Sequence, residues 1–382
     1  MRKTADCVIV GGGVIGCALA YYLAREGVTD CVVVESQHLA SGGTGRCGGG
    51  IRQQWSTEEN ARFAIESVRA FEGLSDELGA DIEFLQGGYL VLAYTDEDVR
   101  QFERNVAMQR SLGLGVEVLT PDEVRARIAP MLNTDGVRMA TFCAKDGSAN
   151  PFLTTKAYAD AARRLGAEFE LHTPVTRVLA DGRGRVTGVE TARGTVSAPV
   201  VVNAAGSHSV LLARTVGVEL PITPTRREIL VTEPLERFFH PMIISFSFGI
   251  YFRQTSHGSV IGGFADPEEP GGFNETSSLE FLVTMSKKLA HLMPALASVK
   301  VVRQWAGLYD TTPDARPLLG PTDGVDGFWQ ASGFSGHGFM IGPAVARSLA
   351  QSIAGRTPAI DIGPLNARRF AEGKVKTERS VV

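Results

Sequence analysis

Two short apolar runs flank a stretch with helical periodicity near the start of the chain. Residues 6–10 are rich in valine and isoleucine, the apolar positions from Val14 to Arg25 have helical spacing, and Cys31–Val34 is again continuously apolar. Continuous apolar runs of this length are typical of strands buried on both faces of a parallel sheet. The pattern therefore predicts a strand–helix–strand unit at the N-terminus.

Helix-start signals mark three further segments. Two have the spacing of a capping box, and the third is a capping residue followed by proline at the first helical position. The first segment predicts a helix to about residue 78, and the last a helix that ends near residue 166. The signals are Ser56 with Glu59, Thr120 with Glu123, and Asn150 before Pro151.

Strand-like segments dominate the second half of the chain. Residues 168–202 consist of short β-rich pieces separated by glycine-containing turns, which predicts a small antiparallel meander. Residues 226–263 predict several more strands, and a helix is expected over about 278–291. A strand at 328–331 and a helix over about 343–353 come last. Because these segments alternate with glycine-rich ones, the domains are expected to interleave along the chain.

Composition narrows the class of protein. A chain of 382 residues is expected to form two or three domains. The net charge is −4 and no Lys/Arg cluster is long enough to follow a nucleic acid. No apolar run approaches the roughly 18 residues of a transmembrane helix. The five cysteines contain no C-x-x-C pair, so we expect no metal site and a reducing, cytoplasmic location.

The N-terminal unit carries a dinucleotide-binding fingerprint. Gly11, Gly13 and Gly16 have the G-x-G-x-x-G spacing between the predicted strand and helix, and Glu35 ends the second strand. In this motif the glycines permit a tight turn, close approach of a pyrophosphate and close helix packing, while the acid binds a ribose. Further glycine-rich loops at 41–50 and 333–338 favour FAD over NAD, because a long cofactor touches several segments of the chain.

Motifs spread over nearly the whole chain carry a family resemblance. They are Gly11-x-Gly13-x-x-Gly16, Ser41-Gly42 with Thr44, Gly87-Gly88-Tyr89-Leu90, Asp146-Gly147, Val202-Asn203-Ala204-Ala205-Gly206, Thr312-Pro313-Asp314, and Gly333-Phe334-Ser335-Gly336-His337-Gly338-Phe339. With these motifs the sequence resembles the D-amino-acid-oxidase superfamily of FAD-dependent oxidoreductases, in its sarcosine and glycine oxidase branch. Within that branch, segment 46–54 is most similar to β subunits of heteromeric dye-linked proline and hydroxyproline dehydrogenases.

The resemblance implies an α/β fold with a split architecture. A Rossmann-like FAD-binding domain is expected from residues 1–85, 145–220 and 308–382. A substrate-binding α+β domain with an antiparallel sheet is expected to be inserted as residues 86–144 and 221–307.

The fingerprint and the resemblance together give a set of expected cofactor contacts. FAD is expected to bind without a covalent link, since Gly307 stands where covalent family members have a cysteine. The resemblance leaves open an FMN at a subunit interface. Arg46 is expected to face the flavin or a partner, and Cys47 to be either a small buried residue or a redox group. The set is Gly11, Gly13, Val14, Ile15, Gly16, Glu35, Ser36, Ser41, Gly42, Thr44, Arg46, Cys47, Gly48, Gly49, Val175, Ala204, Ala205, Gly206, Gly307, Gly333, Gly336, His337, Gly338 and Met340.

Three residues are the candidate catalytic groups. Arg52 matches a family arginine that anchors the substrate carboxylate; the alternative is a structural ion pair. His337 resembles a family histidine near the flavin, against a purely structural role. Tyr251 is expected either to line the substrate pocket or to pack in a sheet. It stands where oxidases of the family have a lysine that promotes the reaction with oxygen, which favours a dehydrogenase. Met340 falls where a family lysine helps to hold the carboxylate, and is expected to form pocket wall.

The resulting hypothesis is an FAD-dependent dehydrogenase. It would oxidise the C–N bond of a small secondary amine or amino acid of the proline, hydroxyproline or sarcosine type by hydride transfer to flavin N5. An electron acceptor or a partner subunit would receive the electrons, with the chain as β subunit of a hetero-oligomer. The alternatives are a glycine- or sarcosine-type oxidase that produces hydrogen peroxide, and a flavin-holding subunit without substrate chemistry.

Overall fold

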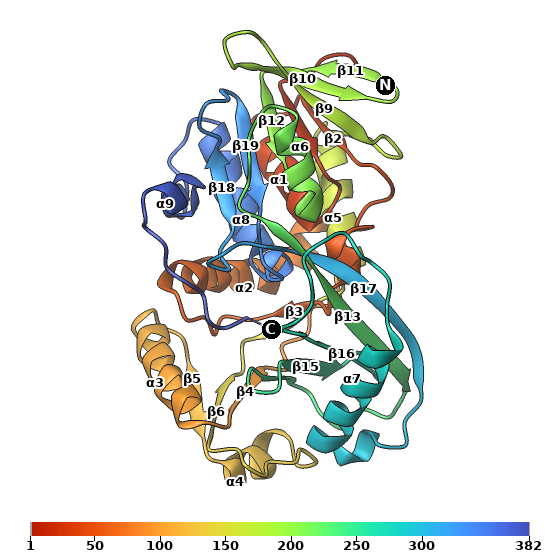
Figure 1. Ribbon diagram of the computed structural model, residues 1–382, viewed down its shortest axis with the longest axis vertical. Coiled ribbons are helices and arrows are strands. Elements are labelled where there is room, and N and C mark those ends of the chain that lie inside the picture. The colour runs from red at the N-terminus through yellow and green to blue at the C-terminus, as the bar shows by residue number, and fades with distance from the viewer. Residues whose placement is uncertain (1, 382) are drawn as a thin grey trace.

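The computed structural model describes residues 2–381, which form two halves stacked along the long axis (Figure 1). The upper half is built on a six-stranded sheet with the order β18-β19-β12-β1-β2-β8. All neighbours in it are parallel except β18 and β19. Its strands are β1 (Cys7–Val10), β2 (Cys31–Val34), β8 (Glu168–Glu170), β12 (Val200–Asn203), β18 (Leu318–Pro321) and β19 (Phe328–Ser332).

Both faces of this sheet are covered, which explains why its central strands β1 and β2 are continuously apolar. Ile9 of β1 packs into the core with the helices on one face. Val8, the next residue back, packs into the core on the other face, beneath a three-stranded meander. The helices are α1 (Val14–Arg25), α2 (Glu58–Leu78), α5 (Pro151–Arg164) and α8 (Gly338–Ile353); the meander is β9 (Val175–Ala180), β10 (Val186–Thr191) and β11 (Gly194–Ser197), with α6 (Ser209–Arg214) beside it.

The lower half is built on an eight-stranded sheet with the order β17-β13-β16-β15-β14-β4-β6-β5 (Figure 1). Every neighbouring pair is antiparallel except β4 and β14. The helix α7 (Leu279–Leu292) packs on it through Phe281, Met285 and Leu289. The strands are β4 (Tyr89–Ala93), β5 (Val116–Leu119), β6 (Met139–Cys143), β13 (Thr223–Pro234), β14 (Met242–Ser245), β15 (Ile250–Gln254), β16 (Ser259–Phe264) and β17 (Val301–Thr311).

Short elements complete the fold. α3 (Asp96–Ser111) flanks β4 and β5, and α2 crosses the middle of the molecule (Figure 1). The others are the helical turns Gly43–Arg46, Val124–Ile128, Gly206–His208, Pro294–Leu296 and Gly363–Leu365, the strands β3 (Gly50–Ile51) and β7 (Gly147–Ser148), and the helices α4 (Pro121–Glu123) and α9 (Arg368–Ala371). Among residues 2–381, no helix has the length and apolar character needed to cross a bilayer.

The expected fold class is confirmed: a parallel, Rossmann-like sheet is combined with a second, almost wholly antiparallel one. The N-terminal unit has the predicted bounds, and the Thr120 and Asn150 caps form as expected. The exact domain boundaries at residues 85, 144, 220 and 307 stay a prediction, and β17 runs across the last of them.

The prediction of a capping box at Ser56 and Glu59 is wrong. The helix α2 begins at Glu58 with Thr57 as N-cap, and no side chain of its own first turn caps it. The carboxylate of Glu378 accepts the Ser56 and Thr57 backbone N–H groups instead, at 2.9 and 3.0 Å. The local spacing misled because the capping group comes from the far end of the chain.

Two further expectations need correction. The last long helix begins at Gly338 rather than near Pro343, because proline this close to a helix start removes only one intrahelical hydrogen bond. Of the five strands between residues 168 and 202, only β9, β10 and β11 form the meander; β8 and β12 join the parallel sheet. β12 is apolar from Val200 to Val202, as a buried strand of a parallel sheet is, whereas β8 at the edge of the sheet reads Glu168-Phe169-Glu170 and is only partly buried.

Candidate active site

The turn between β1 and α1 has the geometry that the fingerprint predicts. Gly11 has a φ of +119°, and a methyl group there would overlap the Ala204 carbonyl oxygen. A methyl group at Gly16 would overlap the Gly11 carbonyl oxygen, so this glycine permits the close packing of helix on strand. A Cβ at Gly13 would meet only the Thr44 Oγ1, at 3.1 Å. The Thr44 hydroxyl also accepts the Val14 N–H, the first amide of α1, at 3.1 Å, and Gly13 itself supplies no side-chain cap, so Thr44 is the only side chain near a Cβ at this glycine.

A large cavity of about 500 Å³ opens beside this turn. Segments from the start, the middle and the end of the chain line it, as expected for a long cofactor. The predicted cofactor contacts that line it are Gly13, Val14, Ile15, Glu35, Ser36, Ser41, Gly42, Thr44, Arg46, Cys47, Val175, Ala204, Ala205, Gly206, Gly336 and Gly338.

Glu35 is fixed at the end of β2 by several donors. Its Oε2 accepts the Gly12 N–H at 2.6 Å, and its Oε1 accepts the Gln37 N–H at 2.8 Å and the Ser36 hydroxyl at 3.0 Å. The carboxylate is buried yet lines the large cavity. This is the placement that the fingerprint requires for a group that binds ribose hydroxyls.

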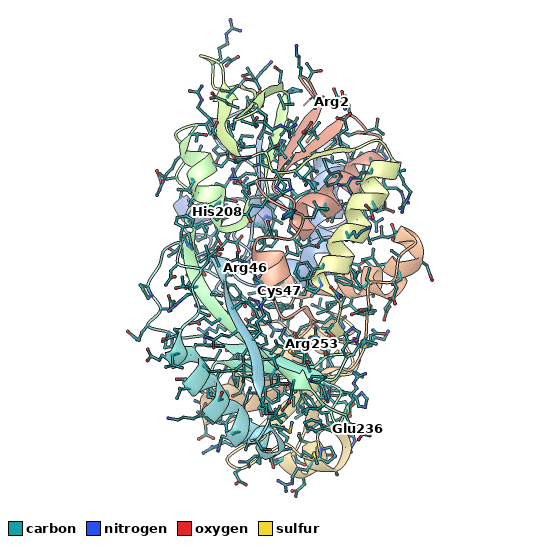
Figure 2. The ribbon with its side chains drawn as sticks, turned by 90° about the vertical axis from the view of Figure 1, so that its right-hand side faces the viewer. Arg2, Arg46, Cys47, His208, Glu236 and Arg253 are labelled. Atoms are coloured by element: carbon teal, nitrogen blue, oxygen red, sulfur yellow. The ribbon has the colours of Figure 1, made fainter. Side chains whose placement is uncertain are left out.

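Arg46 and Cys47 lie between the two halves of the molecule (Figure 2). The Arg46 guanidinium pairs with Glu275 at 2.8 Å and donates to the Ala306 carbonyl at 3.1 Å. Burial raises the pKa of the Cys47 thiol to about 11. A thiol that stays protonated at neutral pH is a poor nucleophile, which argues against a redox role for Cys47, although its side chain is half-buried rather than buried.

A small cavity of about 70 Å³ adjoins the large one, and Cys47, Tyr309, Gly336 and Phe339 line both. Its walls are mainly aromatic. The sequence-predicted residues that line it are Cys47, Gly48, Gly49, Arg52, Tyr251, Gly336, His337 and Met340. The structure thus brings all three candidate catalytic side chains to one cavity.

Arg52 is the cation of the small cavity. Its side chain is only 4% exposed, and the guanidinium carbon lies 4.0 Å from the centre of the Trp55 ring. Its Nη1 donates to the Gln54 carbonyl at 3.0 Å and its Nη2 to the Ser380 carbonyl at 2.5 Å. Neither partner is a carboxylate, so the guanidinium forms no ion pair within the described residues.

The segment around Arg52 is held by Asp146. Its buried carboxylate accepts the Gln53 backbone N–H at 2.9 Å, the Gln53 amide at 3.0 Å and the Gln54 amide at 3.1 Å. Burial raises the pKa of Asp146 to about 6, although these hydrogen bonds oppose the shift. Asp146 therefore positions the strand segment from which Arg52 enters the cavity.

His337 is buried with no polar partner. Its ring is 2% exposed, neither ring nitrogen has a hydrogen bond, and its centre lies 4.7 Å from that of Trp55. Burial lowers the pKa of His337 to about 4; Glu378 opposes this shift and Arg52 adds to it. The imidazole is therefore neutral at physiological pH. A buried ring with both nitrogens free faces a site where a ligand can complete its hydrogen bonds.

Two tyrosines that the sequence analysis did not assign to catalysis or binding also form walls of the small cavity. Tyr89 and Tyr309 line the small cavity with Tyr251. Burial raises the pKa values of Tyr251 and Tyr89 well above the ordinary value of tyrosine, so both hydroxyls stay protonated. Gly50 leaves the space that the Tyr89 hydroxyl occupies. The motif Gly87-Gly88-Tyr89-Leu90 and the glycines around residue 50 are the sequence signals near this contact, and neither predicts it.

Four predicted contacts line neither cavity: Gly11, Gly16, Gly307 and Gly333. The first two shape the turn. Gly307 packs against the Arg46 side chain, and the Gly333 N–H donates to Asp310 at 2.7 Å. Among residues 2–381, no group of His, Cys, Asp or Glu side chains has a metal-binding arrangement.

Comparisons with known proteins identify the family. The model of the family described as FAD dependent oxidoreductase matches residues 6–352. The chain is 33% identical to sarcosine oxidase subunit beta of Arthrobacter sp, over 99% of this chain and 94% of that protein. The crystal structure of L-proline dehydrogenase from P. horikoshii superposes with a TM-score of 0.93 at 35% identity, over 98% of this chain and 100% of that one. Glycine oxidase from Geobacillus kaustophilus gives a TM-score of 0.88 at 25% identity, over 96% and 99%.

The chain belongs to the family of FAD-dependent oxidoreductases, and its expected place in the sarcosine and glycine oxidase branch is confirmed. The large cavity fits FAD: Gly13, Val14 and Ile15 at the N-terminus of α1 line it and suit a pyrophosphate, and Glu35 suits a ribose. The individual contacts, and binding without a covalent link, remain proposals.

Proposed function

We propose that this protein is a dehydrogenase that oxidises the C–N bond of a small secondary amino acid of the proline, hydroxyproline or sarcosine type. The observation that carries the proposal is Arg52, a buried cation without a carboxylate partner in an aromatic cavity next to the dinucleotide cavity. Sarcosine oxidase subunit beta and L-proline dehydrogenase, which this chain resembles along its length, support the substrate class.

Arg52 would bind the substrate carboxylate. A guanidinium offers parallel N–H groups that match both oxygens of a carboxylate, and such bonds are strongest away from water. Trp55, Tyr89 and Tyr251 form the neighbouring walls of the small cavity. With the carboxylate fixed, the Cα–H has one orientation relative to the large cavity.

His337 would meet the substrate amine. Because its imidazole is neutral, a ring nitrogen can accept a hydrogen bond from the N–H of an amine that binds in its uncharged form, with the nitrogen lone pair available for oxidation. Bound FAD would supply the hydride acceptor, N5 of its isoalloxazine. The protein's own contribution is to position the substrate and to provide a neutral hydrogen-bond acceptor for its amine.

Electrons are proposed to leave through a partner. One relative is named as a β subunit, which supports a heteromeric complex. Tyr251, rather than a lysine, at the cavity wall supports a dehydrogenase. The similarity to glycine oxidase favours the alternative, an oxidase that makes hydrogen peroxide. All five cysteines are free thiols, which supports a cytoplasmic location.

The test compares L-proline with pyrrolidine, which has the same ring and no carboxylate. We expect Arg52→Ala to lower kcat/KM for proline by about 30-fold or more, since a hydrogen bond to a charged group contributes about 2 kcal/mol. The rate with pyrrolidine should be nearly unchanged. Arg52→Lys keeps the charge and should recover part of the loss. Equal effects of Arg52→Ala on both amines would overturn the role of Arg52 as carboxylate anchor.

A further inference from the structure

The last described residues of the chain return to the active site. After α9 the segment Lys374–Val381, here called the C-terminal segment, runs down from the upper half and ends between the two halves (Figure 1). Its Lys376 pairs with Glu59 at 2.8 Å, and the Glu378 N–H donates to the Asp314 carbonyl at 2.9 Å. The segment therefore packs against the start of α2 rather than extending into solvent.

Glu378 anchors this segment firmly. Its carboxylate is 1% exposed and accepts the Thr57 hydroxyl at 2.6 Å and the Asn60 amide at 3.2 Å, in addition to the two backbone N–H groups that start α2. Burial alone would raise the pKa of Glu378, but the hydrogen bonds from Ser56 and Thr57 outweigh burial and the pKa lies below its ordinary value. The anion is thus held at a helix N-terminus, where negative charge is favoured.

Beyond this anchor the segment reaches the substrate side of the small cavity. The Ser380 N–H donates to Glu378 at 2.9 Å, and the Ser380 carbonyl accepts from Arg52 Nη2 at 2.5 Å. Val381 is the one residue of the C-terminal segment that lines the small cavity. An anchored backbone carbonyl and one apolar side chain are therefore built into the place where the substrate would lie.

We infer that the C-terminal segment is a fixed wall of the substrate site: Ser380 positions the Arg52 guanidinium, and Val381 limits the size of the carboxylate-bearing substrate. This inference rests on the proposed function, because it takes Arg52 as the carboxylate anchor. The number of hydrogen bonds at Glu378 favours a fixed wall over a plug that the substrate displaces. The Gln54 and Ser380 carbonyls together hold two corners of the guanidinium, which leaves its other N–H groups for a ligand.

The test uses binding of carboxylates that cannot be oxidised to the FAD-loaded protein, measured by calorimetry. The probes are 2-furoate, which has one small ring, and 2-naphthoate, which has two fused rings. Val381→Gly should shift the ratio of affinities toward 2-naphthoate by about tenfold, equal to 1.4 kcal/mol. Val375→Gly is the matched control, because Val375 is exposed and lines neither cavity; it should leave the ratio unchanged.

A chain ended after Arg379 tests the role of Ser380. We expect it to bind 2-furoate about tenfold more weakly, because Arg52 loses an orienting hydrogen bond. For an oxidised substrate the loss should fall on KM, with kcat little changed. Tighter 2-furoate binding by the shortened chain would identify the segment as a plug and overturn the inference. An unchanged ratio in Val381→Gly, or no binding of either probe to the unaltered protein, would also overturn it.

The binding test separates this inference from the proposed function. If no amine reduces the flavin of the unaltered protein, yet Val381→Gly shifts the affinity ratio, the proposed reaction fails and the wall stands. If amines reduce the flavin and the ratio does not move, the wall fails and the reaction stands. Should the shortened chain not fold, Val381→Gly alone decides the outcome.

Discussion

At the level of single residues, burial rather than ion pairing sets the charge of the groups around the small cavity. Burial lowers the pKa of His337 to about 4 and raises the pKa values of Asp146 and Asp310 to about 6. Arg52 keeps its charge with only carbonyl partners. The site therefore offers a neutral hydrogen-bond acceptor beside a cation without an ion-pair partner, an arrangement suited to an amino acid that binds with its amine uncharged.

The buried imidazole makes stability depend on pH. The folded-state pKa of His337 lies near 4, below the unfolded value of about 6.5, so its contribution is present above pH 6.5 and is lost as the pH falls toward 4. When the pH is lowered from 7 to 5, the free energy of unfolding should fall for the unaltered protein. We expect this fall to be smaller in His337→Asn, by up to about 2 kcal/mol.

Urea unfolding of both proteins at each pH measures this difference. Comparison with the variant is needed because Asp146 and Asp310, with raised pKa values, gain stability as the pH falls through about 6 and oppose the trend. Parallel pH profiles for the two proteins would show that His337 is not held neutral by burial.

Some site residues could be predicted from the sequence and others could not. Arg52 and His337 stand in motifs whose spacing marks them. Tyr89 belongs to a strand of the lower sheet, and only the packing of that sheet against the glycines near residue 50 brings its hydroxyl to the cavity. Such contacts between sheets leave no pattern in one segment of sequence.

At the level of elements, the turn between β1 and α1 was predictable because all of its determinants are local. The strand, the glycines and the helix are consecutive, and the observed bounds of β1, α1 and β2 follow from them. The start of α2 was not predictable, because Glu378, 322 residues from Ser56, replaces the local capping box. A helix end satisfied by a distant side chain has no local signature.

Two alanine variants separate the roles of the fingerprint glycines. Gly16→Ala should destabilise the protein by about 1–3 kcal/mol, because its methyl group overlaps the Gly11 carbonyl. Gly13 has a φ of −76°, which alanine adopts easily, so Gly13→Ala should change the free energy of unfolding by less than about 0.5 kcal/mol. The same variant should weaken FAD binding by about tenfold or more.

Unfolding without added FAD measures the first effect, and fluorescence titration with FAD measures the second. If Gly13→Ala bound FAD as tightly as the unaltered protein, the pyrophosphate would not lie at this turn.

At the level of the whole molecule, three distant parts of the chain build one site. The start, the middle and the end line the large cavity, and the C-terminal segment closes the small one. The alternation of glycine-rich and strand-rich segments predicted this interleaving. It did not predict that residues 374–381 would reach Arg52, since their sequence is polar and carries no motif.

The central claim is that this protein is a dehydrogenase of a small amino acid. The most direct test is anaerobic reduction of the FAD-loaded chain by both enantiomers of each amine, followed by admission of oxygen. The account predicts that proline, hydroxyproline or sarcosine bleaches the flavin absorbance, that amines without a carboxylate do so far more slowly, and that reoxidation by air is slow compared with reoxidation by a dye. Rapid peroxide formation would contradict the assignment as a dehydrogenase. A flavin that no amine bleaches would contradict the claim that this site oxidises an amino acid.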